Sequence, residues 1–184
     1  MIREYYRSRV IDTTINIVNS RIESIRNKNI EKTSLRVYDG GFIGVAGAIG
    51  KYSDEELFRE AREALSKNIE YPAAHTSNLS MSMDCRKDII PSEKLREETE
   101  ALLAELRERQ PDFIFSNKVG LTEVHSSLKN DDGLNLDYAD RAIRAELVFK
   151  EKTSSSIFDG FLLINERKYD RKLVLEEFEL FLNG

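Results

Sequence analysis

The sequence has little cysteine and proline and no tryptophan: one cysteine and three prolines stand among 184 residues. A single cysteine, Cys85, excludes an internal disulfide and is typical of a reducing compartment. No histidine or second cysteine lies near it in the chain, so we interpret it as a structural rather than a reactive thiol. No apolar run approaches the roughly 18 residues that a membrane helix needs, and the N-terminus lacks the apolar core of a signal peptide. We therefore expect a cytoplasmic protein with no membrane partner.

Positive charge is also scarce, with 28 basic against 33 acidic residues and a net charge of −5. Proteins that bind nucleic acid usually carry a basic surface, so we expect no direct nucleic-acid partner. The hydrophobic content of 40% is ordinary for a globular protein. A chain of this length buries roughly 70% of its unfolded surface, so it needs neither a disulfide nor a metal to form its core.

The glycine-rich stretch between Gly44 and Lys51 is not a nucleotide-binding loop. A P-loop requires Gly-x-x-x-x-Gly-Lys-Ser/Thr, and here Val45 replaces the first glycine while Tyr52 replaces the hydroxyl residue. The dinucleotide pattern Gly-x-Gly-x-x-Gly also fails, because the three glycines are spaced evenly at three residues. We predict instead that these glycines let a strand bend or pass close to another backbone.

No catalytic or metal-binding motif is present. His75 and His125 lack the spacing of paired ligands, and we interpret both as solvent-facing or hydrogen-bonded structural residues. The serine runs that begin at Ser126 and Ser154 have no Gly-x-Ser-x-Gly elbow, which excludes a hydrolase of that type. The acidic pair Asp131-Asp132 is explained by a turn. We therefore predict no catalytic, cofactor-binding or metal-binding residue in this chain.

Residues 34–65 predict two strands, a short turn and a helix. Asp39-Gly40-Gly41 predicts the hairpin turn, because glycine readily adopts the positive φ that tight turns require. Ser53 with Glu56 three residues later predicts a helix N-terminus, since their side chains satisfy otherwise unpaired backbone amides. Apolar residues then recur at helical spacing as far as Leu65.

The rest of the chain predicts an α+β fold. Residues 4–32 alternate like strands around a turn at Asn19-Ser20, and Asp132-Gly133 predicts another hairpin. Further strands are expected over 81–84, 113–115, 119–128, 134–136, 139–149 and 157–163, and helices over 53–68, 91–109 and 169–182. We predict a curved, mainly antiparallel sheet of about six to eight strands packed with about three helices. The last helix is more apolar than one buried face requires, which predicts deep burial or a missing neighbour.

Two segments resemble the N-terminal domain of the TldD/PmbA family, zinc metallopeptidases that are also described as candidate modulators of DNA gyrase. The segments are Leu35–Ala46, which reads LRVYDGGFIGVA, and Ser53–Leu65, which reads SDEELFREAREAL. Arg36, Gly40 and Gly44 are the most family-like positions. Thr33-Ser34 departs from the pattern, since the family often places a glycine before this strand. The later order of a charged helix, long strands and a closing helix also fits.

The resemblance implies where the chemistry of this family lies. Its zinc ligands are on a His-Glu-x-x-x-His helix and a later cysteine of a C-terminal domain, and this sequence contains neither. No catalytic, cofactor or metal residue carries over, so zinc is expected only in that missing domain. Residues 1–184 are then a single N-terminal-type domain.

The function that the resemblance implies is non-catalytic. The domain would help to enclose a chamber between two subunits, within a peptidase that acts in peptide maturation and proteolysis. Its expected partners are a TldD/PmbA-type subunit, in a homo- or heterodimer, and an unfolded peptide. Two alternatives remain: a free-standing module that binds an extended peptide along a sheet edge, and a catalytically silent subunit of a heterodimeric peptidase.

Overall fold

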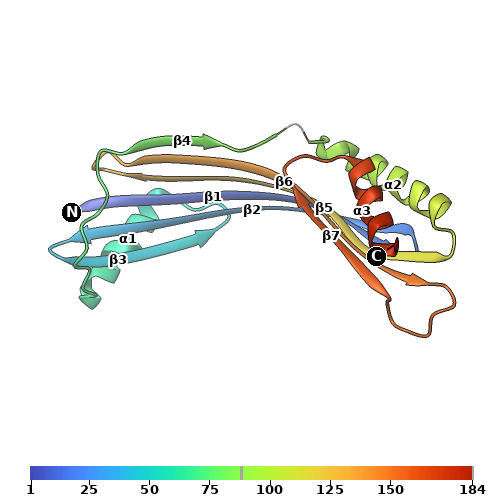
Figure 1. Cartoon of the computed structure of the whole chain (residues 1–184). Helices are drawn as coiled ribbons and strands as arrows, with labels where there is room; N and C mark the ends of the chain where they lie inside the picture. Colours follow the sequence, from blue (N-terminus) through green and yellow to red (C-terminus); the bar gives the residue numbers. More distant parts are fainter. Residues whose placement is uncertain (88, 184) are drawn as a thin grey trace. The chain divides into compact units, whose positions relative to one another are not determined.

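A computed structural model describes residues 1–87 and 89–183 of the chain (Figure 1). The elements are, in order, β1 (Ile2–Val18), β2 (Arg21–Asp39), β3 (Phe42–Ile49), α1 (Asp54–Ala64), β4 (Ser80–Asp84), α2 (Leu95–Arg109), β5 (Phe113–Asn130), β6 (Asn135–Glu151), β7 (Gly160–Glu166) and α3 (Arg171–Asn183). Short 3-10 turns follow α1 at Leu65–Lys67 and precede α2 at Ser92–Lys94. Among the described residues, no helix combines the length and apolarity needed to cross a membrane.

The strands form one seven-stranded sheet. Its order is β3-β2-β1-β5-β6-β4, and β7 pairs with β6. The β2–β3 and β6–β7 pairs are antiparallel, whereas the short β4 runs parallel to β6. The predicted α+β class, with a mainly antiparallel sheet and three helices, is therefore confirmed.

Local turn signals were reliable guides to this topology. The β1–β2 hairpin turns at Asn19 and Ser20, whose φ angles of 50° and 60° match a tight two-residue turn. The β2–β3 turn uses Gly40 and Gly41 at φ values of 57° and 85°. The third predicted turn contains Gly133 at φ 84°. All three predicted turns are confirmed, because each depends on residues adjacent in sequence.

Several boundary predictions were wrong. The strands expected separately over 134–136 and 139–149 form the single strand β6, and the strand expected over 157–163 begins at Gly160 and ends at Glu166. The separate strands expected within 113–128 are one continuous strand, β5, because Asn117 absorbs the irregularity with a φ of 100° and the strand continues past it. The last helix begins at Arg171, two residues later than predicted. Asp170 precedes it and accepts a hydrogen bond at 2.9 Å from the amide of Lys172, as a residue at a helix N-terminus does.

The chain packs as two compact units, and the long strands contribute to both. Unit 1 contains residues 1–11, 29–85 and 124–140, and unit 2 contains residues 12–28, 86–123 and 141–184. Each unit has its own buried cluster.

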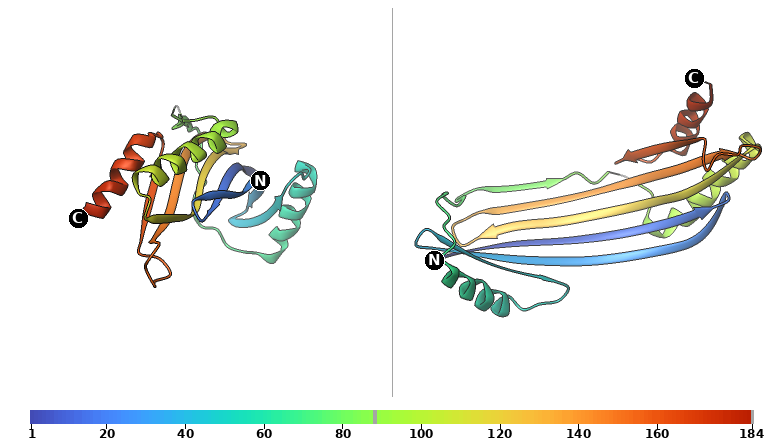
Figure 2. Two further views of the ribbon diagram at one scale, coloured as in Figure 1. Left: turned by 90° about the vertical axis from the view of Figure 1, so that its right-hand side faces the viewer. Right: turned by 90° about the horizontal axis from the view of Figure 1, so that it is seen from below.

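In unit 1, α1 packs on β2 and β3 (Figure 2). Ser53 accepts a hydrogen bond from the amide of Glu56 at 3.1 Å, which confirms the predicted helix start. Buried Leu57 and Ala61 of the helix contact buried Leu35 and Val37 of β2. Burial of a leucine or valine side chain contributes roughly 1.5–3 kcal/mol, so Leu57, Leu35 and Val37 hold the helix on the sheet.

Gly44 explains how closely this helix approaches the sheet. A Cβ built on Gly44 would lie 2.0 Å from the carbonyl oxygen of Ala61 and 2.9 Å from the amide nitrogen of Leu65. No side chain fits at this distance from backbone atoms. The predicted role of the glycine, a close approach of two backbones, is confirmed at this position.

In unit 2, α2 and α3 cover a larger core. Phe115, Phe149 and Phe178 are fully buried and meet edge to face or tilted, with ring centroids 4.7–6.4 Å apart. Aromatic pairs in this geometry contribute about 0.5–1.5 kcal/mol beyond their burial. The described part of α3 buries Val174, Leu175 and Phe178 but leaves Leu173, Leu180 and Phe181 exposed.

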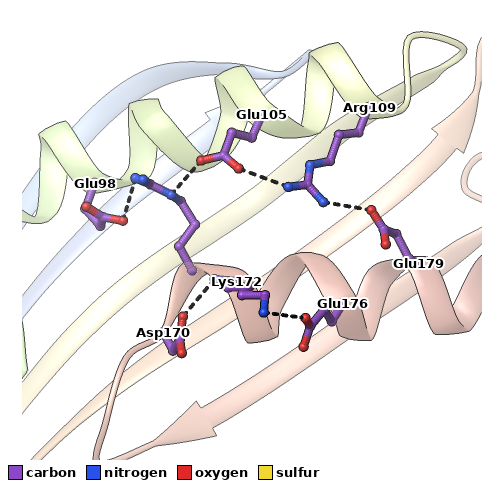
Figure 3. A network of polar contacts seen from close by, with 8 residues as sticks. Glu98, Glu105, Arg109, Asp170, Lys172, Glu176 and Glu179 are labelled. Atoms are coloured by element: carbon purple, nitrogen blue, oxygen red, sulfur yellow. Dashed lines mark hydrogen bonds and ion pairs between the residues drawn. The ribbon is translucent and has the colours of Figure 1, made fainter.

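Ion pairs connect α2 with α3 (Figure 3). The Arg171 guanidinium lies 2.8 Å from both Glu98 and Glu105. Arg109 lies 3.5 Å from Glu105 and 2.9 Å from Glu179. The charges alternate in sign along the line between the helices, so each group lies beside a group of opposite charge.

Candidate functional site

Strand β4 is an edge strand in unit 1. Its neighbour is β6, with Met81 opposite Leu136 and Met83 opposite Tyr138. The carbonyl oxygen of Leu79 accepts a hydrogen bond from the amide of Asn135 at 2.8 Å. The amide of Cys85 donates one to the carbonyl oxygen of Ala139 at 2.8 Å. Successive backbone groups of a strand point to opposite edges.

The odd-numbered residues of this segment thus bond β6. The backbone groups of Ser80 and Ser82 consequently face the open edge of the sheet. The strand predicted over 81–84 is confirmed as β4.

An apolar hollow of about 220 Å³ adjoins β4 in unit 1. Its apolar and aromatic lining consists of Tyr6, Met81, Met83, Leu128, Leu136 and Tyr138. Met81 and Met83 are 51% and 46% exposed. Methionine is flexible and polarizable, so it adapts to different apolar side chains. An open strand edge beside an adaptable apolar hollow is the geometry that peptide recognition by strand addition uses.

The segment that leads from α1 to β4 is tied down at several points. The Ile43 amide donates to Ile69 at 2.9 Å, and the Tyr71 amide donates to Gly41 at 2.7 Å. The Nε2 atom of His75 lies 2.7 Å from a carboxylate oxygen of Asp132. The first two bonds tie the segment to the β2–β3 hairpin, and the contact of His75 holds it against the β5–β6 turn. His75 is therefore hydrogen-bonded, one of the two environments predicted for it.

A polar cluster lies beside this segment on β1 and β2. Glu4 is 7% exposed, and its Oε1 accepts from Tyr38 Oη at 3.0 Å and from Arg36 at 3.1 Å. Burial, together with the hydrogen bond to Glu4, raises the pKa of Tyr38. The phenol stays protonated as a donor. Tyr71 packs against Tyr38 with ring centroids 5.2 Å apart, which joins the cluster to the tied segment.

The remaining candidates from the sequence do not converge on one site. His125 lines a different hollow of unit 1, together with Arg7 and Arg9. Cys85 is half-buried and is a free thiol. Over the described ranges, 1–87 and 89–183, no three His, Cys, Asp or Glu side chains form a group that could hold a metal ion, so we derive no step through zinc.

The Gly44–Lys51 stretch offers no phosphate cradle. The first turn of the helix that follows carries three carboxylates, Asp54, Glu55 and Glu56, which disfavour a phosphate on its backbone amides.

The sequence did not reveal which side chains gather beside β4. Met81 and Met83 alternate with serines, and this signal could have identified the apolar face of the strand. Tyr6, Leu128 and Leu136 also line the hollow, but they belong to strands that are far from β4 in sequence. No local sequence pattern therefore identifies them.

Of the three comparisons with known proteins, only the comparison of structures finds a match. A scan of protein-family models finds no match, and neither does a search of curated proteins. Solved structures do match. TldE from Thermococcus kodakarensis is 14% identical with a TM-score of 0.66, over 96% of this chain and 42% of that chain. A candidate modulator of a DNA gyrase from Thermotoga maritima MSB8 is 11% identical with a TM-score of 0.70, over 94% of this chain and 42% of that chain.

A third structure, a candidate modulator of DNA gyrase from Bacteroides thetaiotaomicron VPI-5482, is 9% identical with a TM-score of 0.70. The match extends over 96% of this chain and 45% of that chain. The fold is that of the TldD/PmbA family. The predicted resemblance is confirmed at the level of fold, which is what identities of 9–14% show. The chain spans less than half the length of each of these TldD/PmbA-type structures.

Proposed function

We propose that this chain acts as the non-catalytic N-terminal part of a TldD/PmbA-type zinc peptidase, in peptide maturation and proteolysis. In this role it helps to enclose the substrate chamber and to build a homo- or heterodimer in the cytoplasm. Zinc and its ligands would belong to a separate catalytic domain or subunit.

One observation carries the proposal. Between 94% and 96% of this chain superposes on only 42–45% of each matched structure. A chain that reproduces one part of a longer architecture is suited to a partial role within it. The exposed apolar residues Leu173, Leu180 and Phe181 of α3 support a covering partner, because apolar groups gathered on a protein surface often mark an interaction site.

The test combines assembly with hydrolysis. The purified chain is mixed with a TldD-type zinc subunit from the same source, and the molar mass is measured by light scattering after gel filtration. We expect a complex, and hydrolysis of an unfolded peptide that requires the zinc subunit and spares the same sequence within a folded protein. Zinc-dependent hydrolysis by the chain alone, or stoichiometric zinc bound to it, would contradict the proposal.

A second candidate function is strand addition of an extended peptide at β4. The observation that favours it is the open edge at Ser80 and Ser82 beside the hollow that Met81 and Met83 line. Backbone hydrogen bonds would supply affinity, and the hollow would select apolar side chains at alternate peptide positions.

Proline substitution separates this candidate from the first. The change Ser82→Pro removes a donor from the open edge and none from the bonds to β6, and proline is tolerated at such an edge. We expect Ser82→Pro to abolish amide chemical-shift changes when an unstructured apolar peptide is added. The variant Ser82→Ala keeps the donor and should bind normally. Equal binding by both variants would eliminate strand addition at β4.

A further inference from the structure

A row of cations lies along β1 in unit 1, on the face that carries α1. Tyr5 packs against the buried cluster beneath α1, whereas Tyr6 lines the hollow beside β4. Alternate residues of a strand share a face, so Arg3, Arg7 and Arg9 lie on the face of Tyr5. This surface is consequently on the opposite side of the sheet from the β4 hollow.

Two adjoining hollows follow this row, and they share Arg7 and Ser127 in their linings. Their volumes are about 280 and 220 Å³. The charged residues that line them are the cations Arg3, Arg7, Arg9, Lys32 and Lys129 and the carboxylates Asp54 and Glu31. The formal charge of the combined lining is +3, and it is +1 when Asp131 and Asp137, the partners of Arg3 and Lys129, are counted, in a chain whose net charge is −5.

The two arginines of the larger hollow are held in place. The Arg3 guanidinium lies 5.7 Å from the ring centroid of Phe58 and bonds Asp131 at 2.8 Å. The hydrogen bonds from Arg3 lower the pKa of Asp131, which keeps that carboxyl ionised. Arg7 lies over the ring of Tyr5 at 5.5 Å. Side chains fixed in this way lose less entropy when they bind a ligand.

The cations already have carboxylate partners, but these pairs leave room for another anion. Arg7 contacts Asp54 at 2.6 Å through one terminal nitrogen, and both side chains are about half exposed. A guanidinium has five N–H donors, so most of its capacity remains. Lys129 lies 3.6 Å from Asp137, beyond ordinary hydrogen-bond distance. Exposed pairs such as these are weak, typically about 0–1 kcal/mol, and a ligand carboxylate can compete with them.

The spacing of the row indicates the kind of ligand. Residues two apart on a strand are about 6.7 Å apart, and an extended peptide places its alternate side chains at the same interval. We propose that these two hollows bind an extended acidic peptide along β1, with carboxylates at alternate positions meeting Arg7, Arg9 and Lys129. A single phosphate group would require converging donors instead of a row. The proposal concerns this surface alone and does not depend on the peptidase role.

The test uses a labelled heptapeptide that alternates glutamate with threonine, and a matched peptide with glutamine in place of glutamate. Binding to the full chain is measured by fluorescence anisotropy at constant ionic strength. We expect the glutamate peptide to bind at least about tenfold more tightly than the glutamine peptide, and Arg7→Gln to weaken it about fivefold or more. Arg62→Gln is the matched control, because Arg62 is exposed on α1 and lines neither hollow.

Four outcomes would overturn the proposal. Equal affinity for the two peptides would remove the carboxylate requirement, and equal weakening by Arg7→Gln and Arg62→Gln would reduce the effect to overall charge. If millimolar inorganic phosphate displaces the peptide, the surface is a site for a small oxyanion and not for an extended peptide. Urea unfolding of each variant verifies that the fold is retained, and amide shift changes should fall on residues 3–9 and 125–129. Changes confined to β4 would overturn this site and support strand addition there.

Discussion

Replacement of Gly44 by alanine should push α1 away from the sheet and destabilise the chain. The new Cβ would lie 2.0 Å from the carbonyl oxygen of Ala61 and 3.1 Å from its carbonyl carbon. These are backbone atoms of a helix, so they cannot rotate away as the end of a side chain could. The helix must move outward by about 1 Å or more, because ordinary van der Waals contact begins near 3.4 Å.

The size of the effect follows from what that movement separates. The contacts of Leu57 and Ala61 with Leu35 and Val37 make up the buried cluster of unit 1. Overpacking costs typically about 1–3 kcal/mol, and the rigid backbone here predicts a loss of about 3 kcal/mol in the free energy of unfolding. For a chain of this length that corresponds to a melting temperature lower by about 6–12 °C.

The assay is urea unfolding followed by circular dichroism, with Gly47→Ala as the matched control. Gly47 is in the same strand, but its Cβ would meet only Thr33 and Ser34 at 3.6 and 3.7 Å, which is ordinary contact. We expect Gly47→Ala to be neutral or to stabilise by up to about 1 kcal/mol, because alanine restricts the unfolded chain. Equal stability of the two variants would refute the close approach of α1.

Three further changes test the electrostatics. Burial raises the pKa of Tyr169 above its usual value, so the folded state keeps the proton that the unfolded state loses near pH 10. Stability should therefore fall above about pH 10, by up to about 1.4 kcal/mol per pH unit, and less steeply in Tyr169→Phe; parallel profiles would contradict this. Arg171→Met should cost about 1–2 kcal/mol in unfolding free energy, less in high salt, whereas the exposed Lys172→Met should cost under about 0.5; similar losses would exclude a role for the ion-pair line. Arg3→Ala should raise the pKa of Asp131, measured by NMR titration, and an unchanged titration would show that their contact is absent in solution.

Local features of the fold could be predicted because their causes are local. Ser53 and Glu56 mark a helix start through bonds to adjacent backbone amides. Asn19-Ser20 and Gly40-Gly41 mark turns through their own tolerance of positive φ. The helix ends and the strand breaks were less certain. Asn117 interrupts the alternation of apolar and polar residues in β5, but the strand continues past it. The neighbouring residues do not show whether such an interruption ends a strand or only bends it.

The candidate surfaces could not be predicted, because they join residues that are distant in sequence. His75 meets Asp132 across 57 residues, and Arg3 meets Asp131 across 128. Strand order decides both contacts, and strand order depends on the packing of whole sheets rather than on any one segment.

The sequence alone therefore determined the class of elements, their turns and the family whose fold they share, since periodicity and turn chemistry act within a few residues. Only the tertiary structure decided that β4 lies parallel to β6 with an open edge, and that Arg3, Arg7 and Arg9 share a face with Lys129. The physical reason is that the alternation within one strand sets which of its side chains lie on the same face of the sheet. The strands and helices packed beside it decide which other side chains they contact.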